Sequence, residues 1–162
     1  MHSMDISTTI FSHNLWANTV LFNRCCELTD EQLDASTPGV YGSIRETLNH
    51  IRRAEKSYLS RISTGKQYNH PDEAPQLTIK EMVKEIKSTG AGFIEWAAKV
   101  DEKDAVMIDW DGTMREVPKT IILNQVINHA TEHRSQIMSI MTQIGIEPPD
   151  VSGWTYFDEQ GN

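Results

Sequence analysis

The chain has 162 residues, 38% hydrophobic and 23% charged, which suits one soluble domain over residues 1–162 with enough length for a real core. Its net charge of -8 repels a phosphate backbone, so we expect no nucleic-acid partner. No apolar run approaches the ~18 residues of a membrane span, and the first residues lack the pattern of a secretion signal, so we expect a cytoplasmic protein without a membrane partner.

The cysteines give little sign of redox chemistry. Only two occur, Cys25 and Cys26, and neighbours in sequence do not build the disulfide framework of a secreted mini-protein. They fall on the apolar face of a predicted helix, where a reactive thiol lacks the exposure that it needs. We therefore interpret both as core residues in a reducing compartment.

The first predicted helix covers residues 5–28, where Phe11, Leu15 and Phe22 recur at helical spacing. Asn14 and Asn18 share this apolar face, and an unpaired buried amide is costly. We therefore expect these two asparagines to line the pocket of a functional site. His13 falls on the opposite face and is expected at the surface.

A second helix is predicted from Ser43, which forms a capping box with Glu46, and it ends before the long loop at residues 63–76. A second capping box, Thr78 with Glu81, starts a third helix. Two glycines within this third helix, at positions 90 and 92, are expected to weaken or bend it.

The next segment, residues 106–117, contains two strand-like runs around Asp111-Gly112, the preferred pair for a type I′ turn, and predicts a β-hairpin. A fourth helix follows from Pro118 to about Gly145, and the aromatic residues of the C-terminal tail, Trp154, Tyr156 and Phe157, are expected to hold the tail against the bundle. The predicted fold is an all-α four-helix bundle with a short β-hairpin insertion before the last helix.

Two histidines, His129 and His133, stand in the apolar stripe of the last helix where aliphatic residues belong. Burying an imidazole without partners costs roughly 1–3 kcal/mol, so the pair requires either hydrogen bonds or a metal ion. The spacing resembles the HExxH motif of metalloproteases, but Ala130 replaces the general-base glutamate. A protease is therefore not favoured.

A catalytic metal usually needs a third protein ligand. His50 is the remaining candidate, because His70 lies in a loop and His13 faces away from the core. His50 lies at the flank of the stripe of the second helix, so geometry alone does not decide whether it reaches the pair.

The segments LNHI (48–51) and VINHATEHRSQI (126–137) resemble the DinB family of metal-binding four-helix bundles. HNLWAN (13–18) and GIEPPD (145–150) extend the resemblance over essentially the whole chain. It implies that His50, His129 and His133 are the metal ligands. Ser135, where many members have Gly, puts the shape of the pocket in doubt but leaves these ligands untouched.

The resemblance implies a thiol transferase as one possible activity, since some members use bacillithiol, mycothiol or glutathione. A divalent cation on three imidazoles activates a thiol, so we expect a small-molecule thiol and an electrophilic substrate as partners. Zinc is the first expectation and nickel the second. Whether the chain is an enzyme stays open, because a non-catalytic, metal-binding homodimeric bundle for interaction or sensing, or a metallohydrolase, fits the same ligands.

Several other residues surround the predicted ligands on the last helix. Gln125, Asn128 and Gln136 lie within one turn of them and either orient the rings or are ordinary polar helix residues. Arg134 is expected at the surface or in a salt bridge.

Overall fold

The structure is a computed structural model that describes residues 5–71 and 75–161. Four long helices form the bundle: α1 (Ile6–Cys25), α3 (Ile44–Thr64), α4 (Ile79–Ala97) and α5 (Lys119–Gln143). Two short helices, α2 (Asp30–Leu33) and α6 (Gly153–Glu159), and a hairpin of β1 (Ala105–Trp110) and β2 (Thr113–Pro118) complete the described part. The predicted bundle with a hairpin before the last long helix is confirmed.

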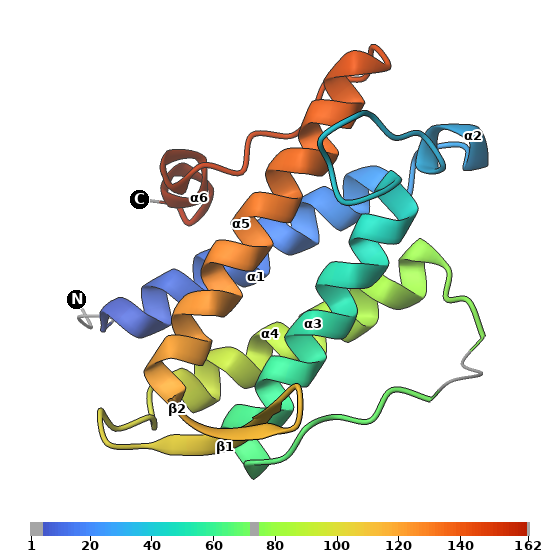
Figure 1. The fold of residues 1–162 in the computed structure, drawn as a ribbon. Helices are drawn as coiled ribbons and strands as arrows, with labels where there is room; N and C mark the ends of the chain where they lie inside the picture. Colours follow the sequence, from blue (N-terminus) through green and yellow to red (C-terminus); the bar gives the residue numbers. More distant parts are fainter. Residues whose placement is uncertain (1–4, 72–74, 162) are drawn as a thin grey trace.

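The four long helices pack as a ring in which α1 and α3 each contact both α4 and α5 (Figure 1). The hairpin closes the end of the bundle where α3 and α4 finish and α5 begins, while α2 lies at the opposite end (Figure 1). Helix α6 lies beside α1. None of the described helices is long and apolar enough to cross a membrane.

Both predicted capping boxes are present. The Ser43 hydroxyl accepts a hydrogen bond from the Glu46 backbone N–H at 3.2 Å, and the Glu46 carboxylate accepts one from the Ser43 N–H at 2.8 Å. Thr78 and Glu81 form the same reciprocal pair at the start of α4. These bonds satisfy backbone donors that have no partner within the helix, and they fix where α3 and α4 begin.

The hairpin turns at Asp111 and Gly112, as predicted. Their φ angles are 52° and 83°, both positive as a type I′ turn requires, and Trp110 pairs with Thr113 across the turn. The Asp109 carboxylate accepts a hydrogen bond from the Gly112 N–H at 2.8 Å, which stabilises the turn further.

The two glycines of α4 allow close helix packing, and α4 runs through both as one helix. A Cβ atom on Gly90 would lie 2.5 Å from Cδ1 of Leu15 on α1, and one on Gly92 would lie 2.6 Å from Cδ2 of Leu59 on α3. Both positions therefore let neighbouring side chains approach the backbone of α4, which explains glycine there better than a weak or bent helix does.

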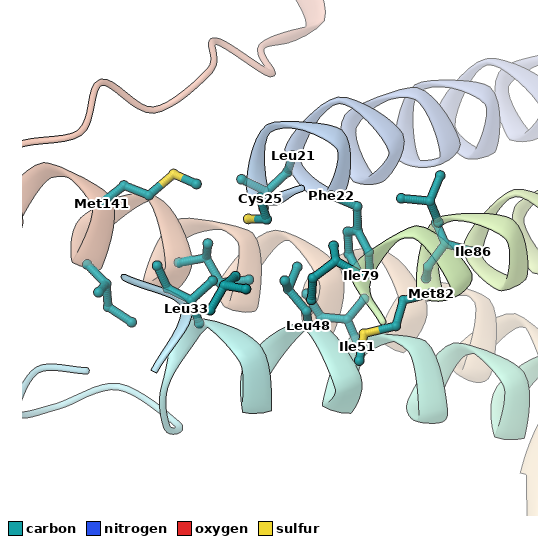
Figure 2. Packing of buried hydrophobic residues seen from close by; sticks show 14 residues of the cluster. Leu21, Phe22, Cys25, Leu33, Leu48, Ile51, Ile79, Met82, Ile86 and Met141 are labelled. Carbon is teal, nitrogen blue, oxygen red and sulfur yellow. The ribbon is translucent and has the colours of Figure 1, made fainter. Parts of the chain in front are cut away.

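The apolar core consists of two clusters separated by a polar layer. One cluster fills the end of the bundle away from the hairpin, where side chains from all four long helices meet (Figure 2). The other lies at the hairpin end and includes Phe11, Phe93 and Val126. Each helix changes from one cluster to the other near its middle. Buried polar side chains lie at this middle level: Asn14, Asn18, Glu55, Thr89, His133 and Arg134.

The C-terminal tail forms helix α6, which the sequence pattern did not predict. Tyr156 packs against His13 and Trp16, with ring centroids 5.5 and 5.3 Å apart, so this aromatic residue anchors the tail as expected. Trp154 and Phe157 are 82% and 52% exposed, contrary to the expectation, because they stand on other faces of α6 than the one that Tyr156 presents to the bundle.

Candidate metal centre

Three imidazoles from two helices converge at the polar layer. His129 and His133 lie one turn apart on α5, and His50 faces them from α3. The candidate ligand atoms of the three side chains all lie within 4.8 Å of one another. His50 is therefore the third member of the cluster, which helix geometry alone had left undecided.

The hydrogen bonds show which ring nitrogens are available. Nε2 of His129 lies 2.9 Å from Nε2 of His50, so one proton shared between them is all that the pair can hold without a clash. Nδ1 of His133 donates to the Gln136 side-chain oxygen at 2.9 Å. This bond fixes the tautomer of His133 and leaves its Nε2 with a free lone pair.

Burial keeps two of the rings neutral. The pKa of His129 is lowered to about 4, first because burial disfavours the charged ring and then because His133 and His50 are close. The pKa of His50 is lowered for the same reasons, burial first and His133 second. Neutral imidazoles are the form that coordinates a cation, so these rings are ready to bind one at neutral pH.

The donor set fits a divalent metal ion. A proton between His50 and His129 satisfies two lone pairs, whereas a cation can satisfy one from each of the three rings. Nδ1 of His129 is buried and has no hydrogen-bond partner among the described residues, but a cation in the cluster would bind Nε2, the nitrogen that faces His50, so the fit rests on the three converging rings. Imidazole donors suit zinc, nickel, copper or iron, so they do not select one of these metals.

Two tyrosines form the walls of the centre. Tyr41 stacks on His50, with ring centroids 4.1 Å apart, and lies nearly perpendicular to the ring of His133. Tyr58 lies nearly perpendicular to the ring of His129, with centroids 5.8 Å apart. Sequence analysis missed both roles, because Tyr41 stands in a loop without periodicity, and Tyr58 recurs with Ile51 and Ile62 at helical spacing, as a core residue would.

One cavity is lined by a histidine of the cluster, and a second is lined by Tyr58, whose ring contacts His129. One, of about 350 Å³, is lined by His50 and by its neighbours Tyr41, Glu46, Asn49 and Arg53. The other, of about 580 Å³, lies between the hairpin and the helices, and its walls include Tyr58, Ile108, Trp110 and Gln125. Both volumes are in the range of small-molecule sites. The histidine cluster therefore has space for a reactant beside His50, and the larger cavity lies on the other side of Tyr58.

Behind the histidines, Asn14 and Asn18 bridge a buried base and a buried acid. One guanidinium nitrogen of Arg134 donates to the side-chain oxygens of both asparagines at 2.7 Å. The two amide groups in turn donate to Oε1 of Glu55, at 3.1 and 2.8 Å. Asn14 also lines a separate cavity of about 420 Å³ between α1, α5 and α6. A cofactor-binding role for Asn14 and Asn18 stays a prediction.

Arg134 and Glu55 are buried charged residues that sequence analysis did not expect in the core. Arg134 was expected at the surface or in a salt bridge, but it is only 4% exposed, and burial lowers its pKa to about 10 while Glu55 acts in the opposite direction. Burial raises the pKa of Glu55, against the effect of its two amide donors and of Arg134. Glu55 follows Leu48 and Ile51 at helical spacing, so it lies on the apolar face of its helix. A charged residue on an apolar face is the sequence signal that predicts a buried acid at this position.

The remaining candidates separate clearly. Gln136 orients His133, whereas Gln125 and Asn128 are exposed. His13 bonds to the backbone oxygen of Val151 at 2.9 Å, and His70 bonds to the Ser57 hydroxyl and to the backbone of α3, so neither belongs to the cluster.

A four-helix bundle with a three-histidine cluster between two of its helices defines a class of helical proteins with a candidate metal site. The sequence model of the DinB family matches residues 2–161, and the chain belongs to this family. The protein DinB of Bacillus subtilis (strain 168) is 22% identical over 151 residues, which cover 87% of this chain and 87% of that relative.

The solved structures include a similar fold. The crystal structure of a DinB-like protein from Bacillus cereus ATCC 10987 matches with a TM-score of 0.62 and 22% identity, over 87% of this chain and 92% of that one. At this identity, the likeness supports the arrangement of the bundle and says nothing about the reaction.

Proposed function

We propose that the protein is a metal-dependent enzyme that transfers a low-molecular-weight thiol to an electrophilic substrate. The observation that carries this proposal is the convergence of His50, His129 and His133, with no carboxylate among the described residues of the cluster, beside a cavity that His50 lines. A divalent cation on such neutral ligands is a Lewis acid that lowers the pKa of a coordinated thiol or water.

The chain's own residues hold this centre in shape. Gln136 fixes the tautomer of His133 and also accepts a hydrogen bond from the Tyr41 N–H at 3.3 Å, so it connects the loop that covers His50 to α5. Tyr41 and Tyr58 restrict the rings of His50 and His129. Rigid support of this kind is what keeps metal ligands in their productive orientation.

The proposed reaction forms a carbon–sulfur bond. The thiol loses its proton to solvent, its sulfur donates an electron pair to an electrophilic carbon, and the bond to the leaving group breaks with its electrons. The apolar walls of the hairpin cavity, including Ile108 and Trp110, suit the carbon body of the electrophile. We propose zinc as the metal, with nickel second.

The test is a turnover assay with metal-free protein reloaded with zinc or nickel, several cellular thiols and a chromogenic aryl halide. We expect conjugation only with metal and thiol together, and we expect its loss in His129→Ala. His70→Ala is the matched control, since this histidine lies outside the cluster. Conjugation that persists after complete metal removal would contradict the proposal.

The same assay separates the alternatives. Ester or amide hydrolysis without added thiol would identify a metallohydrolase. A closed coordination shell, with a large stability loss on chelation and no turnover, would identify a non-catalytic bundle.

We also propose a cytoplasmic homodimer. Both cysteines are free thiols, which fits a reducing compartment. Ile6, Trp154 and Phe157 are exposed by 77%, 82% and 52%, and apolar side chains of this size favour burial against a second copy. Sedimentation should show a dimer that Trp154→Ser weakens. A monomer at every accessible concentration would contradict this part of the proposal.

A further inference from the structure

We propose that the cavity beside His50 is a subsite for the carboxylate of an anionic thiol, and that Arg53 binds this carboxylate. The inference rests on the proposed function, because it names the class of thiol that the same centre takes. It is argued from the cavity, from the charges around it and from the pairing of the arginines on α3.

The cavity is built on one face of α3. Glu46, Asn49, His50 and Arg53 follow one another at spacings of three, one and three residues, and Tyr41 closes the cavity from the preceding loop. Side chains three or four residues apart on a helix are neighbours, with Cβ atoms ~5–6 Å apart. Arg53 and His50 therefore border the same small space, so one short molecule can place its sulfur near the histidines and its carboxylate near Arg53.

Arg53 differs from two other arginines of the same helix. Arg45 is paired with Asp34 at 2.8 Å and with Asp30 at 2.7 Å, and Arg52 is paired with Glu85 at 2.6 Å. The half-buried side chain of Arg53 makes no ion pair or hydrogen bond within residues 5–71 and 75–161. Because partial burial makes an unpaired charge costly, its guanidinium favours an acidic ligand from solution.

The nearby acid, Glu46, forms no ion pair with Arg53. The Glu46 carboxylate belongs to the capping box at the start of α3, where it accepts the Ser43 N–H at 2.8 Å. Among the described residues, the ligand cluster contains no carboxylate, so a metal ion bound there would keep its positive charge. With such an ion beside the opposite charges of Arg53 and Glu46, the cavity would be positive on a chain with a net charge of -8.

A carboxylate is the ligand that these features suit. The planar guanidinium of arginine binds carboxylates through two parallel hydrogen bonds, which a neutral hydroxyl cannot match. A thiol that bears a carboxylate can therefore use both the metal centre and Arg53, whereas a neutral thiol can use only the metal centre.

The test compares two probes on zinc-loaded protein by isothermal titration calorimetry: 3-mercaptopropionate, which carries a carboxylate, and 2-mercaptoethanol, which does not. In Arg53→Gln, we expect the affinity for 3-mercaptopropionate to fall about tenfold or more, because charged hydrogen bonds are lost. The affinity for 2-mercaptoethanol should stay within about twofold. We compare the ratio of the two affinities, 3-mercaptopropionate over 2-mercaptoethanol, between the native protein and Arg53→Gln. This comparison removes the intrinsic difference between the two thiols in zinc binding.

Two further variants sharpen the test. Arg24→Gln removes the same charge from α1, outside the cavity, and should leave the ratio unchanged. Arg53→Lys keeps the charge and should retain part of the preference for 3-mercaptopropionate. Zinc content and circular dichroism confirm that each variant is loaded and folded.

Equal loss of both probes in Arg53→Gln, or no loss of either, would overturn the subsite. An Arg53-dependent preference without any turnover would support the subsite and contradict the proposed transfer reaction. Turnover with anionic thiols that Arg53→Gln leaves unchanged would support the transfer reaction and overturn the subsite. Failure of the one proposal is therefore distinguishable from failure of the other.

Discussion

At the scale of single residues, the orientation of His133 depends on one amide. Gln136 accepts the Nδ1 proton of His133, binds the Tyr41 backbone and donates to Glu132 at 3.5 Å. Without this amide, the ring can take the other tautomer and turn its free nitrogen away from His50 and His129.

We therefore predict that Gln136→Ala weakens metal binding by about 10–100-fold, the usual effect of losing a partner behind a metal ligand. Competition with a chromogenic chelator measures this affinity. Gln125→Ala, an exposed glutamine on the same helix, is the control and should change it little. Equal affinity in Gln136→Ala and the native protein would show that the amide does not orient the ring.

The two adjacent cysteines differ at this scale as well. Cys25 is fully buried, and burial raises the pKa of its thiol to about 12, whereas Cys26 is partly exposed. In the unfolded chain the Cys25 thiol ionises near its ordinary value of 9.0. The unfolded state therefore loses this proton first, and the stability that Cys25 contributes is fully present below pH 9 and falls as the pH rises toward 12.

We predict that the unfolding free energy falls with pH above 9 by up to about 1.4 kcal/mol per pH unit from this one thiol. Urea titrations at several pH values measure the slope. Cys25→Ala should show a shallower slope, because it has no thiol to ionise. Equal slopes in the two proteins would mean that the Cys25 thiol is not buried in the native state.

Some residues of the metal centre could be predicted from the sequence, and others could not. The pair on α5 is visible in its spacing, and His50 follows from the resemblance to a family. Tyr41 was not predictable, because stacking on His50 depends on a loop conformation that no periodicity encodes. Arg134 was expected at the surface or in a salt bridge because charged residues on a helix are usually exposed. Its burial is compensated by Asn14 and Asn18 on α1, which connect its guanidinium to the carboxylate of Glu55 on α3.

At the scale of elements, the polar layer joins three helices. Asn14 and Asn18 from α1 stand between Glu55 from α3 and Arg134 from α5, and all four are buried. Because Arg134 follows His133 directly, the layer also fixes the rotation of α5 about its axis. The positions of the metal ligands and the packing of the bundle are therefore coupled.

We predict that Glu55→Ala destabilises the metal-free fold by about 3–5 kcal/mol, because it leaves Arg134 as an uncompensated buried charge. Chemical denaturation measures this change. Glu95→Ala breaks an exposed pair with Lys99 and should cost no more than about 1 kcal/mol. A cost for Glu55→Ala as small as that of Glu95→Ala would show that the layer is not a unit of stability.

The long helices could be predicted because their periodicity and capping boxes extend over many residues. The short helices could not be found by periodicity, since α2 has four residues and α6 has seven. A local signal for α2 is present in the sequence, because Thr29 and Gln32 have the spacing of a capping box, and the structure contains both of its hydrogen bonds. Helix propensity predicts that the glycines of α4 weaken the helix, but it does not predict why they are there. The side chains that approach them come from other helices, which the local sequence does not encode.

At the scale of the whole molecule, the bundle holds a polar centre between two apolar clusters. The clusters supply the hydrophobic stabilisation, so the level between them can carry imidazoles, amides and charges. The order of the helices around the ring brings α3 and α5 into contact, and this contact assembles the three histidines.

The central claim is that His50, His129 and His133 hold one cation together, and the metal content of His50→Ala tests it most directly. This ligand comes from a different helix than the other two, so its removal tests the assembly as well as the spacing on α5. Elemental analysis after dialysis against a weak chelator should find about one zinc or nickel ion per chain in the native protein and in His70→Ala, and little in His50→Ala. Full metal content with unchanged affinity in His50→Ala would contradict the account.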